Sequence, residues 1–172
     1  MSASEPAIAF HRGEGCPRAV DCAALARSFA LLLPHFPRAI ARVDVLLVGD
    51  AAMDAAHRRY MDVAGTTDVM SFPAHDESDP TAPVEADLIV CIDVAAREAA
   101  ARGHPCDREI LLYAVHGALH ACGYRDDTPE SALAIHAEED RILALGGGGV
   151  VYARPSLAEG GLAPPADEDR RR

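Results

Sequence analysis

The chain has 172 residues, of which 49% are hydrophobic, and this size and composition suit one globular domain with a buried core. All sixteen basic residues are arginine, and 27 acidic residues give a formal net charge of −11. That charge argues against broad, non-specific binding of nucleic acids, which depends on neutralising phosphates, but it leaves room for a local arginine patch.

The hydrophobic runs are far shorter than a membrane span. The N-terminus has neither a charged segment nor a continuous hydrophobic segment of the kind that a signal peptide needs. We therefore expect a cytoplasmic protein with no membrane partner. Five cysteines without a C-x-x-C pair argue against both a closed disulfide framework and a thiolate zinc cluster.

Hydrophobic periodicity and turn residues predict the order β-α-β-α-β-β-α-α-α. The expected strands cover 7–11, 43–48, 67–72 and 86–92. The expected helices run from a cap at Asp21 to about Phe36, over 51–60 after a cap at Asp50, over 94–102 after Asp93, over 107–122, and from a cap at Thr128 to Leu145.

The acidic, proline-bearing run at 73–85 is expected to be a surface loop. Residues 153–172 are rich in proline and glycine and poor in large hydrophobic residues, so we expect a disordered C-terminal tail there. Residues 1–152 then form a single domain of the α/β class, with a small mixed sheet of about four strands packed with about five helices.

The stretch HGALHACGYRDD, at 116–127, contains the strongest chemical signal. His116 and His120 lie four residues apart in a predicted helix, so both side chains point from the same face. Their neighbours are strongly hydrophobic, where imidazoles need partners. The pair is either a set of packed core histidines or two ligands of one metal ion.

A third ligand must come from outside that helical face. Gly123 can adopt the left-handed conformation that ends a helix, and a carboxylate follows shortly after it. Asp126 can reach back to an ion held by His116 and His120, and Asp127 is the fallback. Two histidines and an aspartate are a competent zinc set, so we expect one Zn²⁺ per chain.

Peptidases that bind zinc through H-E-x-x-H use the residue after the first histidine as a general base. That residue is Gly117 in this chain. The helix therefore carries a zinc-binding pattern like that of the metzincins without the glutamate that peptide hydrolysis requires, which argues against a protease.

The same stretch resembles the signature H-G-x-L-H-x-x-G-Y-D-H of the YbeY family, the metal-dependent endoribonucleases of bacterial rRNA maturation and ribosome quality control. TTDVMSFP, at 66–73, is similar to the family's P-T-D-V-L-S-F-P, and ADLIVCID, at 86–93, is similar to its G-D-I-x-I strand. The resemblance covers about residues 40–146. It implies a single-strand-specific endoribonuclease that binds an rRNA precursor, with the ribosome or a ribosome-associated protein as a further partner and no DNA substrate.

Carried over by position, the first two family ligands fall on His116 and His120, and the third, usually histidine, falls on Asp126. The family often has an RNA-contacting arginine where this chain has Met61. Either Arg59 or its neighbour Arg58 takes that role from an adjacent position, with Arg59 the first choice, or the contact is absent from this chain. The resemblance also implies that Ser71 lines the cleft.

Two other functions fit the residues. One is a metal-dependent hydrolase of another substrate class, such as a peptidase or esterase, which suits the negative charge but lacks the glutamate. The other is a metal-stabilised module that binds the ribosome without cutting RNA. The nuclease and the binding module are separated by whether His116→Ala leaves partner binding intact while it abolishes cleavage.

Overall fold

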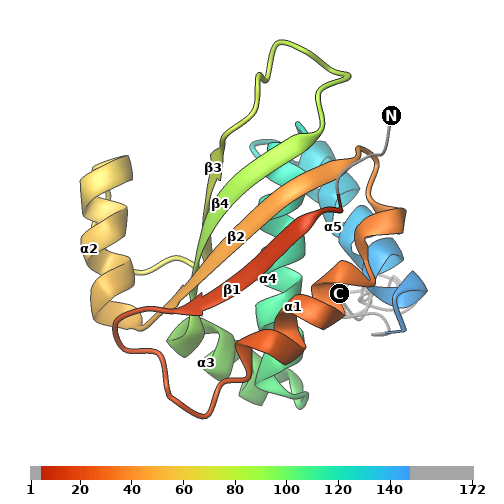
Figure 1. Cartoon of the computed structure of the whole chain (residues 1–172). Coiled ribbons are helices and arrows are strands. Elements are labelled where there is room, and N and C mark those ends of the chain that lie inside the picture. The colour runs from red at the N-terminus through yellow and green to blue at the C-terminus, as the bar shows by residue number, and fades with distance from the viewer. Residues whose placement is uncertain (1–4, 148–172) are drawn as a thin grey trace, which may run out of the picture.

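The computed structural model describes residues 5–147 (Figure 1), so the tail predicted at 153–172 lies outside the described residues. The strands are β1 (Ala7–Arg12), β2 (Ile40–Val48), β3 (Val69–Pro73) and β4 (Val84–Cys91). The α-helices are α1 (Cys22–Ala30), α2 (Asp50–Met61), α3 (Ile92–Arg102), α4 (Cys106–Ala121) and α5 (Pro129–Leu145), and a 3₁₀ turn covers Leu33–His35. The predicted α/β class, with a four-stranded mixed sheet and five helices in this range, is confirmed.

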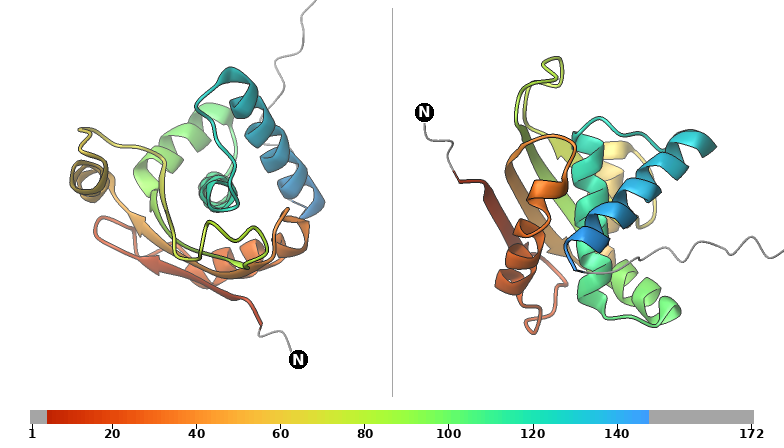
Figure 2. Two further views of the ribbon diagram at one scale, coloured as in Figure 1. Left: turned by 90° about the horizontal axis from the view of Figure 1, so that it is seen from above. Right: turned by 90° about the vertical axis from the view of Figure 1, so that its right-hand side faces the viewer.

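The sheet has the order β1-β2-β4-β3. β1, β2 and β4 run parallel, and β3 joins the edge antiparallel to β4, with Ser71 opposite Leu88. Figure 2 shows α4 surrounded by the sheet, α3 and α5. The central helix is thus buried along most of its length, and its C-terminal end meets the start of α5.

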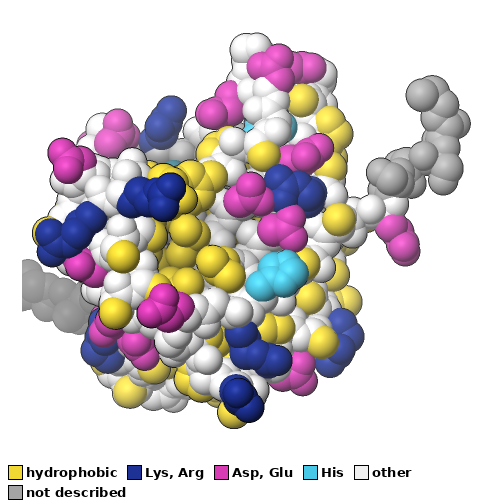
Figure 3. All heavy atoms as spheres, turned by 60° about the vertical axis from the view of Figure 1, so that its left-hand side comes forward, with side chains coloured by type: hydrophobic (Ala, Val, Ile, Leu, Met, Phe, Trp, Pro, Cys, Tyr) yellow, Lys and Arg dark blue, Asp and Glu magenta, His cyan; other side chains and the backbone are white. Residues whose placement is uncertain are grey.

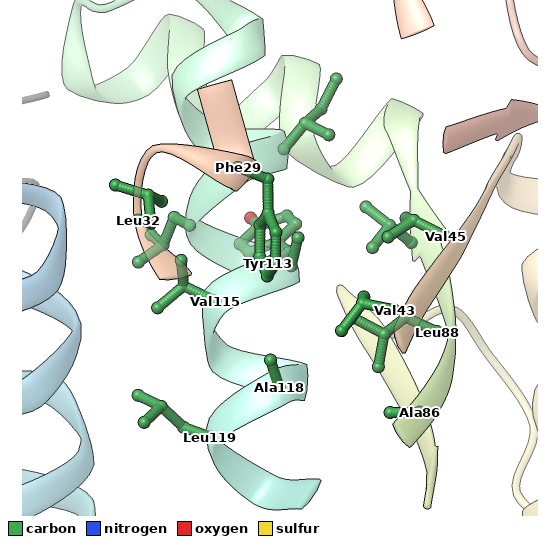
Figure 4. Packing of buried hydrophobic residues seen from close by; sticks show 14 of the residues in the cluster. Phe29, Leu32, Val43, Val45, Ala86, Leu88, Tyr113, Val115, Ala118 and Leu119 are labelled. Atoms are coloured by element: carbon green, nitrogen blue, oxygen red, sulfur yellow. The ribbon is translucent and has the colours of Figure 1, made fainter. Parts of the chain in front are cut away.

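Alternation along the strands decides which side chains enter the core. Val43, Val45 and Leu47 of β2 are fully buried on the face that α4 covers. α4 packs against this face, and its Val115 and Leu119, on the side of the helix away from the strands, join the same buried cluster, as Figure 4 shows. Because these contacts anchor α4 to the sheet, the polar side chains at its C-terminal end are held by the main core.

Close approach between α4 and the sheet depends on Gly117. A Cβ atom at this position would lie 2.9 Å from Leu88 Cδ2 and 3.1 Å from Val69 Cγ2. Only a residue without a side chain fits here without moving its neighbours. Gly117 therefore lets α4 pack against β3 and β4 directly beside His116.

The other face of the sheet is only partly covered, by α2. A hollow of about 360 Å³ lies there, lined by hydrophobic residues including Leu46, Tyr60, Phe72 and Ile89. Figure 3 shows hydrophobic side chains gathered on this side of the molecule, with acidic, basic and histidine side chains around them. Asp87 belongs to this face, where Arg42 binds it at 2.6 Å.

Several helix starts differ from the sequence-based predictions. Asp50 is the first residue of α2, not its cap, and its backbone N–H donates to Asp93 Oδ2 at 2.8 Å. Asp93 therefore satisfies the first turn of α2, while α3 begins two residues earlier than expected. The helix expected up to Phe36 ends at Ala30, where the chain continues into the 3₁₀ turn.

Over residues 5–147, every helix is too short or too polar to cross a bilayer.

Candidate metal centre

The C-terminus of α4 turns the chain back toward its own last turn. Gly123 has φ of 102°, a left-handed conformation that favours glycine. The backbone N–H of Gly123 donates to the His120 carbonyl at 2.9 Å, and that of Tyr124 donates to the Leu119 carbonyl at 3.0 Å. This turn directs the following residues back across the end of the helix.

The turn brings Asp126 to the histidine pair. His116 Nε2 and His120 Nε2 lie 2.9 Å apart, and Asp126 Oδ2 lies 3.7 Å from the first and 3.6 Å from the second. Within residues 5–147, these three form the one group of His, Cys, Asp or Glu side chains with ligand atoms all within 4.8 Å of one another. Asp127 instead accepts a hydrogen bond from Ser131 Oγ at 3.4 Å, at the start of α5.

The opposite nitrogens of the two imidazoles are each held by an acceptor. His120 Nδ1 donates to the Tyr124 carbonyl at 3.0 Å, and His116 Nδ1 donates to Glu139 Oε1 at 2.5 Å. Because a carbonyl only accepts, His120 carries its proton on Nδ1, and its Nε2 presents a lone pair. Glu139 favours the same tautomer for His116. Two lone pairs 2.9 Å apart repel each other unless a cation lies between them.

That cation is either a proton or a metal ion. Burial lowers the pKa of His116, but the hydrogen bond and charge of Glu139 and the charges of Asp68 and Asp126 outweigh it, so the pKa is raised above its ordinary value. When no metal is bound, His116 therefore holds a proton more strongly than a free imidazole does. A metal ion must displace it, which makes metal binding weaker as the pH falls.

The spacing of the three ligand atoms fits zinc. Bonds of about 2.0–2.1 Å in a tetrahedron place ligand atoms about 3.3–3.4 Å apart. The observed separations of 2.9, 3.6 and 3.7 Å lie on either side of that value. A fourth tetrahedral position then remains for water or substrate, as in catalytic zinc sites.

Glu139 supports the centre from α5. It is fully buried, and its Oε2 atom has no hydrogen-bond partner in the described part of the chain. A buried carboxylate is stabilised by the positive charge next to it, here His116 or an ion bound beyond it. α5 is held in place by a capping box, in which Thr128 and Ser131 bond each other's backbone N–H groups.

A cavity of about 580 Å³ adjoins the centre at His120. β3 contributes Ser71, whose hydroxyl donates to the Gly117 carbonyl at 2.8 Å. The remaining lining comes from α2, the rest of β3, the loops around β3 and the turn after α4, and includes His57, Met61, Thr67, Val69, Met70, Pro73, Glu77, Gly123 and Arg125. The cavity is therefore a cleft with polar walls, with room for a substrate larger than a water molecule.

The two arginines expected to contact RNA are not among the residues that line this cleft. Arg58 forms an ion pair with Asp54 at 2.9 Å, and Arg59 lies over the Tyr60 ring, 5.5 Å from its centroid. Met61, one residue further along α2, does line the cleft. Ser71 does so as well, as the family resemblance implied.

Sequence reasoning missed three residues near the centre. Glu139 had a usable signal, because it shares the 3.6-residue spacing of the buried α5 residues Ile135 and Ile142. A charged residue at a core position of a helix calls for a buried partner. His57 and Arg125 line the cleft, and no spacing rule would have placed them there.

The chain is similar in sequence to known proteins. A curated endoribonuclease YbeY of Mycobacterium tuberculosis is 38% identical over 111 residues, which span 60% of this chain and 63% of that protein. The relative in Mycobacterium ulcerans is 37% identical over 111 residues, which span 60% of this chain and 62% of that protein. The chain thus matches less than two thirds of the length of these relatives.

A solution structure of TM1509 from Thermotoga maritima aligns with 86% of this chain and 98% of its own, at a TM-score of 0.49 and 16% identity. The sequence profile of endoribonuclease YbeY matches residues 22–146, which include the whole candidate metal centre and every residue that lines the cleft. The chain belongs to the YbeY family.

Proposed function

We propose that this chain is a metal-dependent endoribonuclease that cuts single-stranded RNA during rRNA maturation and ribosome quality control in the cytoplasm. One zinc ion per chain is held by His116, His120 and Asp126, and residues 1–152 form one catalytic domain. The ribosome or a ribosome-associated protein is its further partner. The observation that carries the proposal is the pair of imidazole Nε2 atoms 2.9 Å apart, with Asp126 beside them at the end of an open cleft.

When bound, zinc supplies Lewis-acid activation of a phosphoryl oxygen and of an attacking water. The chain's own residues arrange the reactants. Glu139 and the Tyr124 carbonyl fix the tautomers and ring orientations of the two histidines. The Ser71 hydroxyl is occupied by the Gly117 carbonyl, so this serine shapes the cleft wall and is not an activated nucleophile.

The absence of a side chain at position 117 favours phosphodiester over peptide cleavage. A peptidase on this pattern needs a glutamate directly after His116. In this chain the position is Gly117, and even a Cβ atom there would lie 2.9 Å from Leu88. The packing against the sheet therefore excludes a carboxylate base at that point of the helix. Phosphodiester cleavage relies more on electrostatic stabilisation of the phosphate, which a metal and arginines provide.

Elemental mass spectrometry of the purified protein tests the metal first. We expect about one zinc per chain, lost on Asp126→Ala and kept on Asp127→Ala, because only Asp126 lies beside the histidines. Zinc retained by Asp126→Ala and lost from Asp127→Ala would assign the other aspartate. No bound zinc in the natural protein after reconstitution would overturn the metal centre.

Cleavage assays then test the reaction. The natural protein should cut a single-stranded oligoribonucleotide and leave the matching duplex intact, and His116→Ala should abolish cutting. Retained ribosome binding by His116→Ala would agree with a nuclease that also docks there. Zinc bound without any RNA cleavage, together with ribosome binding, would support the binding module instead of the nuclease.

A further inference from the structure

The cleft beside the metal centre contains few charged side chains. Its lining includes one carboxylate, Glu77 of the β3–β4 loop, and one permanently charged cation, Arg125 of the α4–α5 turn. His57 and His120 are its other ionisable groups. In a chain of net charge −11, an anionic substrate needs a local cation to enter such a cleft.

Arg125 is free to supply that charge. Its side chain is exposed, and within residues 5–147 it forms no ion pair or hydrogen bond. The other arginines near the cleft are engaged, since Arg58 binds Asp54 and Arg59 lies over Tyr60. The turn at Gly123 fixes the backbone on which Arg125 stands, directly before Asp126.

We propose that Arg125 binds a backbone phosphate of the RNA strand in this cleft, next to the centre formed by His116, His120 and Asp126. This inference rests on the proposed nuclease function. It assigns the substrate-positioning cation to the α4–α5 turn, and no longer to Arg58 or Arg59 of α2. The guanidinium fork matches two phosphate oxygens at once, which orients the strand as well as attracting it.

Glu77 counteracts the attraction that Arg125 exerts on phosphates in the cleft. Its carboxylate repels phosphates from the part of the cleft formed by the β3–β4 loop, while Arg125 attracts them at the α4–α5 turn. Replacement of Glu77 should for this reason strengthen RNA binding, whereas replacement of Arg125 should weaken it.

The test measures binding apart from catalysis. A single-stranded 2′-O-methyl oligoribonucleotide, checked by gel electrophoresis to remain intact, is titrated with zinc-loaded protein by fluorescence anisotropy at several salt concentrations. Arg125→Gln is compared with Arg18→Gln, which changes the net charge equally in an exposed loop that contributes nothing to the cleft. Zinc content and thermal unfolding are measured for each variant, and both should match the natural protein.

We expect Arg125→Gln to weaken binding roughly tenfold at low salt, as the loss of a hydrogen-bonded charge does. The slope of log K against log salt should become shallower by about 0.7, the value for one phosphate contact with a single strand. Arg125→Lys should keep the slope and recover part of the affinity. Arg18→Gln should leave the slope unchanged, and Glu77→Gln should tighten binding.

In cleavage assays, Arg125→Gln should raise KM with little change in kcat, because the contact is made in the bound substrate as well as in the transition state. An affinity and slope equal to those of Arg18→Gln would overturn the role of Arg125 while leaving the nuclease intact. A natural protein that neither binds nor cuts single-stranded RNA would instead overturn the proposed function, and this inference with it.

Discussion

Replacing Glu139 with glutamine tests whether the carboxylate that holds His116 strengthens metal binding. The variant keeps the size and shape of the side chain and removes only its charge. Glu139 is fully buried, and its Oε1 atom lies 2.5 Å from His116 Nδ1. The glutamine oxygen can still accept that hydrogen bond, so the His116 ring keeps its orientation while Nε2 becomes a weaker electron donor.

The expected loss of zinc affinity is at the upper end of the range for residues that hydrogen-bond to a metal ligand. Outer carboxylates change metal affinity by about 10- to 100-fold, and the larger value corresponds to about 2.7 kcal/mol. Burial supports the larger value here, because water and salt screen a fully buried charge only weakly. We therefore expect about a hundredfold weaker zinc binding at neutral pH.

Competition with a fluorescent zinc chelator measures this affinity. Glu138→Gln is the matched control, because Glu138 is the adjacent residue of α5 and pairs with Arg141 instead of facing the histidines. Circular dichroism shows whether both variants keep the fold. A Glu139→Gln protein that binds zinc within twofold of Glu138→Gln would refute the argument that Glu139 supports the centre.

Three further predictions concern stability and reactivity. Gly117→Ala should lower the free energy of unfolding in urea by about 1 kcal/mol, because its Cβ would lie 2.9 Å from Leu88 Cδ2, and an unchanged midpoint would contradict this close packing. Thr128→Ala should remove the cap shared with Ser131, cost about 1 kcal/mol and lower the melting temperature by about 2–4 °C, as calorimetry can test. Burial raises the pKa of Cys122 to about 11, so alkylation at pH 8 followed by mass spectrometry should leave this thiol largely unmodified until denaturant is added.

Much of the fold follows from local sequence patterns. The alternation in β2 places Val43, Val45 and Leu47 on one face, and period two is enough to predict a strand with one buried side. The cap at Thr128 and the proline after it predict the start of α5, and the structure agrees. These features depend on neighbours along the chain, so the sequence alone reveals them.

Predictions of where helices begin and end were less accurate, because tertiary contacts compete with local capping. Asp93 was expected to start its own helix, yet its carboxylate accepts from the backbone of Asp50 in α2. The two residues are 43 positions apart, and only the pairing of β2 with β4 brings them together. No local pattern carries that information.

For the candidate metal centre, the sequence by itself determined that His116 and His120 share a helical face and that Gly123 ends the helix, since both depend on helix geometry. Only the tertiary structure placed Asp126, and not Asp127, beside the histidines, joined Glu139 to His116 and placed Arg125 in the cleft. Those outcomes depend on how α4 meets α5 and β3. Helix packing sets that geometry through contacts between residues far apart in the chain, which spacing along the sequence does not encode.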